Sequence, residues 1–287
     1  MPYDPSIQKN EENKKNIFGV IVHSFFVIPF LLAIFSILLF VSVRILTMEK
    51  RNVNDYLEDV KTGGLTKRWQ SAFELSRVLS NPKEVPHDDK FIKNMIAAFE
   101  KSKGDDDRIR QYLALAMGRS GIADFADILI KTAGDEKNEN LYAIITGLGI
   151  LHSDKAIPVL LDVLNSDNAH LRLAAVVALG NIGAKDSINL LKKSLNDPEP
   201  NVQWGSAISL ANLKDPAGKE VLLKLLDRTY LARFPQVDLQ EQTHVLLVAL
   251  EAAGNLKDVQ IKQAIDRLAK NDQNMNVRKL ALKLSEK

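Results

Sequence analysis

A step of 31 residues organises the centre of this chain. Gly180, in the segment ALGNIG, is preceded at this interval by Gly149 and Gly118, and the next step forward reaches Ala211. A leucine or a methionine stands before each of these four residues. A period of 20–50 residues is typical of repeat proteins in which like units stack on one another. The chain is therefore expected to form a solenoid.

Each unit divides into two helices. The segment NAHLRLAAVVALGNIG, residues 168–183, has apolar residues on several sides, which predicts an inner helix packed between two like helices. Ala174, Ala175 and Ala178 permit a close approach, and Gly183 supplies a stop. A second apolar stripe follows in SDKAIPVLLDVLN. The predicted fold class is all-α, an α-solenoid of stacked antiparallel helix pairs.

The register breaks at two places, and both fit insertions. About eleven extra residues coincide with the loop SNPKEVPHDDK, and about nine coincide with RTYLARFPQ. Allowing for them, the pattern continues to the last residue and gives six helix pairs and a final helix. We place the repeat domain at residues 55–287.

The segment from Ile17 to Val43 has no Asp, Glu, Lys or Arg. A helix needs roughly 20 apolar residues to cross a bilayer, and a signal peptide has a shorter apolar region of about 7–15 residues. We therefore expect a single transmembrane helix over residues 17–46, after a polar tail (1–16) and before a juxtamembrane linker (47–54). Positive charges are similar on both sides, so the positive-inside rule barely separates the orientations. The working prediction is a bacterial cell membrane with the repeats in the cytoplasm.

Composition restricts the chemistry of the chain. The formal net charge is +2 and there is no cysteine. A balanced charge lacks the basic excess that is usual in nucleic-acid-binding proteins, and the absence of cysteine excludes disulfides and thiolate metal sites. The five histidines are scattered, and no nucleophile motif or acid–base pair stands out. We expect no catalytic residue, no metal ion, no cofactor and no small-molecule substrate, and hence no enzyme.

A row of large side chains is the candidate binding surface. At about 100° per residue, Trp204 points nearly opposite to the apolar stripe of its helix, toward the predicted concave face. Leu173 and Tyr142 stand one and two units before it, and Trp69 has the same phase across the first insertion. Aromatic side chains are enriched where interfaces hold most binding energy. The same pattern is equally compatible with rings that cover the backbone of a neighbouring helix.

Arginines and an insertion complete the candidate site. Arg68, Arg110 and Arg172 share one phase beside the aromatic row, although pairing with acidic residues in the joints is the favoured interpretation for them. The second insertion adds Tyr230, Arg233 and Phe234 outside the register. Insertions in solenoids often lie on the binding face, so we predict that these residues contact a protein partner.

The repeat resembles the HEAT-repeat family, and particularly the short HEAT-like repeats of phycobilisome lyases. The resemblance rests on LRLAAVVALGNIG, HSDKAIPVLLDVL, NDPEPNVQWGSAISLANLKDP and DQNMNVRKLAL, with Gln203 where an arginine is usual. The layout, an anchor followed by repeats, is similar to a bacterial group of membrane-anchored HEAT proteins. The resemblance carries over no activity, since such repeats occur in scaffolds, adaptors and occasional enzymes. The predicted function is a membrane-anchored scaffold or adaptor that binds a protein partner on its concave face. A lyase-like enzyme and a nucleic-acid-binding protein are the alternatives.

Overall fold

The computed structural model describes residues 23–47, 51–136 and 138–286. These residues form helices and no strand, and they belong to two separate compact units that meet in the chain at Arg51 and Asn52. The predicted tail (1–16), the start of the predicted membrane helix (17–22) and residues 48–50 of the predicted linker lie outside the described residues. The predicted all-α solenoid is confirmed.

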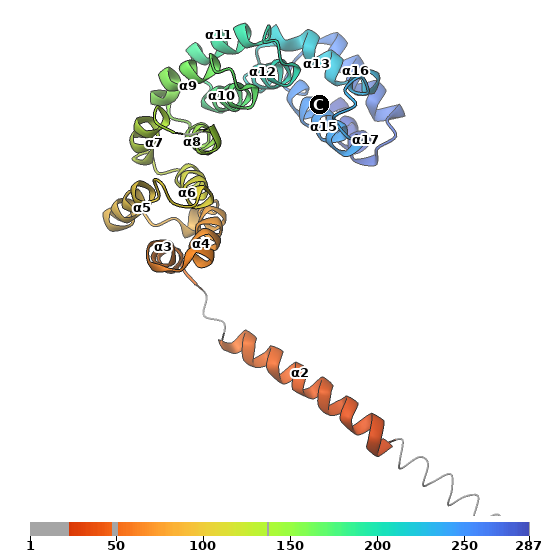
Figure 1. Cartoon of the computed structure of the whole chain (residues 1–287). Coiled ribbons are helices and arrows are strands. Elements are labelled where there is room, and N and C mark those ends of the chain that lie inside the picture. The colour runs from red at the N-terminus through yellow and green to blue at the C-terminus, as the bar shows by residue number, and fades with distance from the viewer. Residues whose placement is uncertain (1–22, 48–50, 137, 287) are drawn as a thin grey trace, which may run out of the picture. The chain divides into compact units, whose positions relative to one another are not determined.

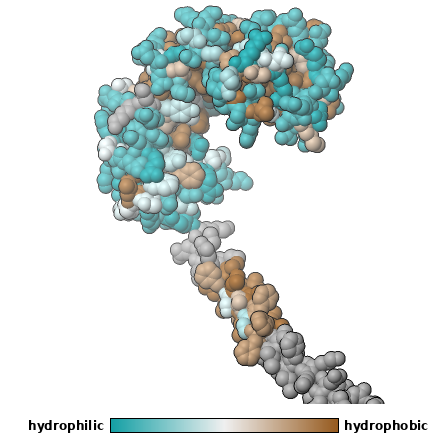
Figure 2. Space-filling model, turned by 45° about the vertical axis from the view of Figure 1, so that its right-hand side comes forward, coloured by the Kyte–Doolittle hydropathy of each residue, from teal (hydrophilic) through white to brown (hydrophobic). Residues whose placement is uncertain are grey.

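The first unit contains one long helix. A short π-helical turn, η1 (His23–Val27), leads into α2 (Ile28–Thr47). The segment Phe25–Val43, which runs from η1 into α2, is long and apolar enough to cross a membrane. Its side chains are not buried by other described parts of the chain. Figure 2 shows the surface of this helix as largely brown, the colour of hydrophobic residues.

The second unit consists of two rows of helices that follow one arc (Figure 1). Helices of the inner row line the hollow of the arc, and each packs against the next one in the row. The inner row comprises α4 (Leu65–Val78), α6 (Asp107–Ser120), α8 (Asn138–Ile150), α10 (Ala169–Ile182), α12 (Pro200–Asn212), α15 (Leu239–Ala253) and α17 (Met275–Ser285).

Helices of the outer row alternate in the chain with those of the inner row. This row comprises α3 (Val53–Thr62), α5 (Asp89–Lys101), α7 (Phe125–Ala133), α9 (Ile157–Leu164), α11 (Lys185–Ser194), α13 (Lys219–Leu225) and α16 (Val259–Asn271). Short turns lie in the connections: η2 (Pro82–Glu84), η3 (Asp154–Ala156), η4 (Pro216–Gly218) and α14 (Arg228–Leu231). The first insertion holds η2 and the second holds α14.

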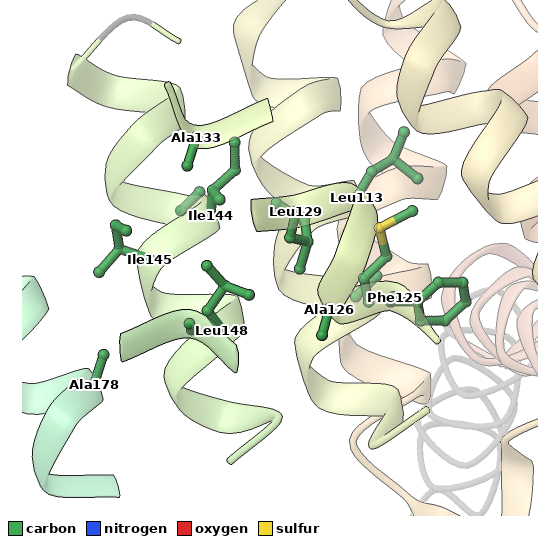
Figure 3. Close-up of a cluster of buried hydrophobic side chains, with 14 of the residues drawn as sticks. Leu113, Phe125, Ala126, Leu129, Ala133, Ile144, Ile145, Leu148 and Ala178 are labelled. Carbon is green, nitrogen blue, oxygen red and sulfur yellow. The ribbon is translucent and has the colours of Figure 1, made fainter. Parts of the chain in front are cut away.

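Aliphatic side chains fill the space between the two rows. In Figure 3, Leu113 of α6, Leu129 of α7 and Ile144 of α8 point into this space, and all three are fully buried. Ala178 of α10 faces α8, which it can approach closely because its side chain is small. The buried residues form two clusters that meet at α12, which contributes residues to both.

Glycines set the distance between neighbouring inner helices. A Cβ atom added at Gly118 would lie 2.5 Å from the Cα of Gly147, and one added at Gly149 would lie 2.7 Å from the Cα of Ala178. At Gly180 it would lie 2.4 Å from the Oγ of Ser209. Each distance is too short for a real side chain. The glycines that define the 31-residue step are therefore the points where consecutive inner helices touch.

We predict that Gly149→Ala destabilises the repeat domain although alanine is the better helix former. The added methyl group collides with the backbone of α10, and overpacking of this kind typically costs about 1–3 kcal/mol. About 1 kcal/mol lowers the melting temperature of a domain of this size by roughly 2–4 °C. Circular dichroism during heating of the detergent-solubilised full chain measures the change.

The matched control is Gly134→Ala. Gly134 has a φ of −71° and a Cβ there would meet no atom within 4 Å. The melting temperature of the Gly134→Ala variant should equal that of wild type or be slightly higher. Equal melting temperatures for Gly149→Ala and wild type would show that the inner helices are not held by this contact.

Candidate functional site

The predicted aromatic row has a different environment at each of its positions. Tyr142 is 50% exposed, whereas Leu173 and Trp69 are half-buried. The Trp69 ring is covered by the guanidinium of Arg108, whose Cζ lies 4.6 Å from the ring centroid. Only part of the predicted row is therefore accessible to a partner.

The expected exposure of Trp204 is wrong. Its side chain is only 5% exposed because the second insertion folds over the ring. The ring of Phe234 meets it edge-on with the centroids 4.9 Å apart, and the indole N–H donates to the Tyr230 hydroxyl at 3.2 Å. The insertion thus forms an aromatic cluster with α12. Three predicted site residues do come together, but as a small core, and Arg233 beside them is exposed.

The three arginines link successive repeats through hydrogen bonds within the domain, and we call each such set of bonds a staple. Arg172 donates from Nε and Nη2 to the two carboxylate oxygens of Asp197, both at 2.8 Å, and from Nη1 to the carbonyl of Ser166 at 2.8 Å. Arg172 therefore links the connection that precedes α10 to the connection that precedes α12; we call these connections joints. A fork of this kind is among the stronger side-chain hydrogen bonds.

Arg110 and Arg68 repeat this arrangement. Arg110 is buried, pairs with Glu136 and donates to the carbonyl of Phe99 at 2.6 Å. Arg68 pairs with Asp105 and donates to the carbonyl of Val60 at 2.8 Å. Their hydrogen-bonding groups are engaged within the chain. These arginines pair with acidic residues of the joints, in agreement with the interpretation favoured from the sequence. They therefore have few free hydrogen-bond donors for a partner protein.

A more continuous surface lies one helical turn beyond the predicted row. Its members have the same spacing as the glycines, insertions included, and each lies on the solvent side of its inner helix. We call it the concave row: Phe73, Leu115, Thr146, Val177, Ile208 and Val248. Phe73, Val177 and Val248 are 41%, 45% and 37% exposed. The 31-residue step connects Leu115, Thr146, Val177 and Ile208, and the two insertions account for the longer steps to Phe73 and Val248, so the spacing that predicts the repeat also contains this row.

Aromatic rings enlarge the concave row at its N-terminal end. The rings of Phe73 and Tyr112 meet edge-on with their centroids 5.3 Å apart. Tyr112 is half-buried, and Trp69 lies one turn before Phe73 on α4. This end of the row is therefore more aromatic than the rest.

The second insertion also borders a pocket of about 830 Å³ against α16. Arg228 and Asp272 lie in its lining and form an ion pair with a 2.7 Å contact. Among the residues that the structure describes, no group of three or more metal-ligating side chains is placed to hold a metal ion.

Comparison with known proteins identifies the repeat. A model of HEAT repeats matches residues 95–173 and 157–233. The chain contains HEAT repeats. A solved structure of the CpcE–CpcF complex of phycocyanin lyase from Nostoc sp. PCC7120 is similar in fold, with a TM-score of 0.57 and 22% identity, covering 83% of this chain and 96% of that one.

A curated relative changes one prediction. A stretch of 90 residues is 36% identical to deoxyhypusine hydroxylase of Arabidopsis thaliana and makes up 30% of this chain and 29% of that protein. The prediction that the chain is not an enzyme is wrong, because a related sequence with HEAT-like repeats is an enzyme.

We predict that Trp204→Ala destabilises the HEAT-repeat domain strongly. Truncating a buried tryptophan to alanine typically costs about 3–5 kcal/mol, and here the rings of Tyr230 and Phe234 lose their common contact. Urea unfolding followed by circular dichroism measures the free energy of unfolding. Tyr142→Ala, at an exposed position of the same phase, should change it by less than about 0.5 kcal/mol. Similar losses in both variants would contradict the difference in burial.

We also predict an acid-sensitive contribution from the Arg172 staple. The hydrogen bond from Arg172, aided by the backbone N–H of Glu199, holds the pKa of Asp197 below its usual range. A lowered carboxyl pKa stabilises the fold above the unfolded-state value of about 3.9, and this stabilisation is lost as the pH falls through the folded-state pKa.

The free energy of unfolding of wild type should therefore fall more steeply below about pH 4 than that of Asp197→Asn, which cannot titrate at this position. Denaturant unfolding at a series of pH values makes the comparison. Parallel curves for the two proteins over that range would show that Arg172 does not stabilise the Asp197 carboxylate.

Proposed function

We propose that this protein is a membrane-held HEAT-repeat scaffold that binds a protein partner along the concave row. The observation that carries the proposal is the row itself. Phe73, Val177 and Val248 stand in one register and are more than a third exposed, and the members between them are half-buried. Apolar side chains gathered on a protein surface commonly mark an interaction site.

The hollow of the arc favours an elongated ligand. Each inner helix from α4 to α15 contributes one member to the concave row, so a partner segment that follows the row meets one of these side chains at every step. Solenoids commonly use such extended concave surfaces for binding. The HEAT repeats thus provide several weak contacts in a line, and their sum determines the affinity.

The membrane part of the proposal rests on the first unit. Phe25–Val43 is a helical segment of 19 residues without Asp, Glu, Lys or Arg, which at about 1.5 Å per residue approaches the roughly 30 Å of a bilayer core. Its exposed phenylalanine and leucine side chains have no cover in the described chain. We assign the helix to a bacterial cell membrane, with the repeats in the cytoplasm. The linker is shorter than the predicted range 47–54, because α2 ends at Thr47 and α3 begins at Val53.

The membrane assignment predicts the behaviour of the protein in fractionation. The full chain should stay in the membrane pellet after washing with alkaline carbonate, and a variant lacking residues 23–47 should appear in the supernatant. Release of the full chain by carbonate would contradict a spanning helix. Reaction of a cysteine placed at Leu161 with an impermeant maleimide only after lysis would support the cytoplasmic side.

The partner assignment predicts a site-specific cross-link. A photoreactive amino acid at Val177, on the concave row, should yield an adduct of higher mass in the native membrane. The control position is Leu161, which is 44% exposed on the outer helix α9. Adducts at both positions in equal yield, or at neither, would contradict a partner on the concave row.

A further inference from the structure

The concave row and the turn before it are free of Asp, Glu, Lys and Arg from α4 to α12. Next to the row on the same helices stand Trp69, Gln111, Tyr142 and Leu173, and the insertion covers Trp204. Charged groups do stand at the edge, but they bond within the chain: Arg108 pairs with Asp106, Arg77 pairs with Glu74, and Arg119 donates to the carbonyl of Ser76. A ligand that buries charge on this surface loses hydration without a compensating partner. The surface therefore selects an uncharged ligand.

Amide side chains flank the uncharged surface. Asn181 and Asn212 are exposed and stand 31 residues apart, one turn beyond Val177 and Ile208. Gln70 is exposed on α4, and the Gln111 amide has one long hydrogen bond, 3.4 Å to Asn140. Amide N–H groups donate to peptide carbonyls. An α-helical ligand would leave these donors unused because its carbonyls are already bonded along the helix, whereas an extended chain presents free carbonyls.

The spacing of the inner helices distinguishes between extended conformations. Packed helices lie about 8–10 Å apart. A polyproline II helix has three residues per turn and rises about 3.1 Å per residue, so one side chain in three returns to the same face after about 9 Å. In a β-strand, side chains on one face recur after about 6.7 Å, which is shorter than the distance between the helices, so they no longer align with the helices after two repeats. The repeat distance of polyproline II matches the distance between the helices.

We infer that the concave row binds an uncharged, proline-rich segment of a partner protein in the polyproline II conformation. Every third residue packs on one member of the row, and the carbonyls between them accept hydrogen bonds from amides such as those of Asn181 and Asn212. The exposed rings of Phe73 and Tyr142 stack against proline rings, as in other aromatic-lined surfaces that recognise this conformation. The inference rests on the proposed function, whose site it shares.

The test is a titration of fluorescein-labelled decaproline with the full chain in detergent micelles, followed by fluorescence anisotropy. Saturable binding is expected for wild type. Val177→Glu places a charge on the row and should weaken binding at least tenfold, while Leu161→Glu on the outer row should leave it unchanged. Circular dichroism checks that both variants are folded. A decapeptide of alternating glycine and serine should not bind, because it lacks the preformed conformation.

Three results would overturn the inference. They are no saturation by decaproline at millimolar protein, equal affinity of wild type and Val177→Glu, and binding of an alanine-rich helical peptide that matches decaproline. If the Val177 cross-link forms but decaproline does not bind, the concave row still binds a partner and only its assigned chemistry fails. If neither occurs, the proposed function fails as well.

Discussion

Consecutive inner helices touch at a glycine in each central repeat, and the rest of the domain depends on this contact. Gly118, Gly149 and Gly180 each face a residue 29 positions further along the chain, where a side chain of any size would collide. The contact leaves neighbouring helices little freedom to slide or rotate. It therefore decides which side of every inner helix faces the core, the joints and the solvent.

The arginine staples and the concave row follow from that register. Arg172 reaches forward to Asp197 and back to Ser166 because the joints of successive repeats lie at the same height. Val177, on the opposite side of the same helix from the core, faces solvent together with Thr146 and Ile208. The second insertion modifies this plan at α12, where it converts a surface tryptophan position into a small aromatic core. The accessible surface consequently extends from α4 toward α12 with its aromatic residues at one end.

The sequence predicts what is periodic and local. The 31-residue step, the helix pairs, the stop at Gly183 and both insertions could be read from spacing and from small residues, because these properties depend on neighbouring positions. The burial of Trp204 could not be read in this way. Helical projection treats α12 alone, whereas the residues that cover the ring, Tyr230 and Phe234, come from a loop whose destination is a long-range contact. The sequence leaves a lyase-like enzyme as an alternative, and the absence of short catalytic motifs does not exclude an enzyme, as the match to deoxyhypusine hydroxylase shows.

The concave row is the central claim, and paired cysteines test it directly because the natural chain has none. Cysteines at Thr146 and Val177 should react rapidly with a bis-maleimide that spans about 8–10 Å, the usual distance between packed helices. A pair at Leu161 and Val177, which lie on opposite rows, should not be bridged. Bridging of the second pair, or none of the first in the folded protein, would contradict a register in which successive inner helices present these residues to one surface.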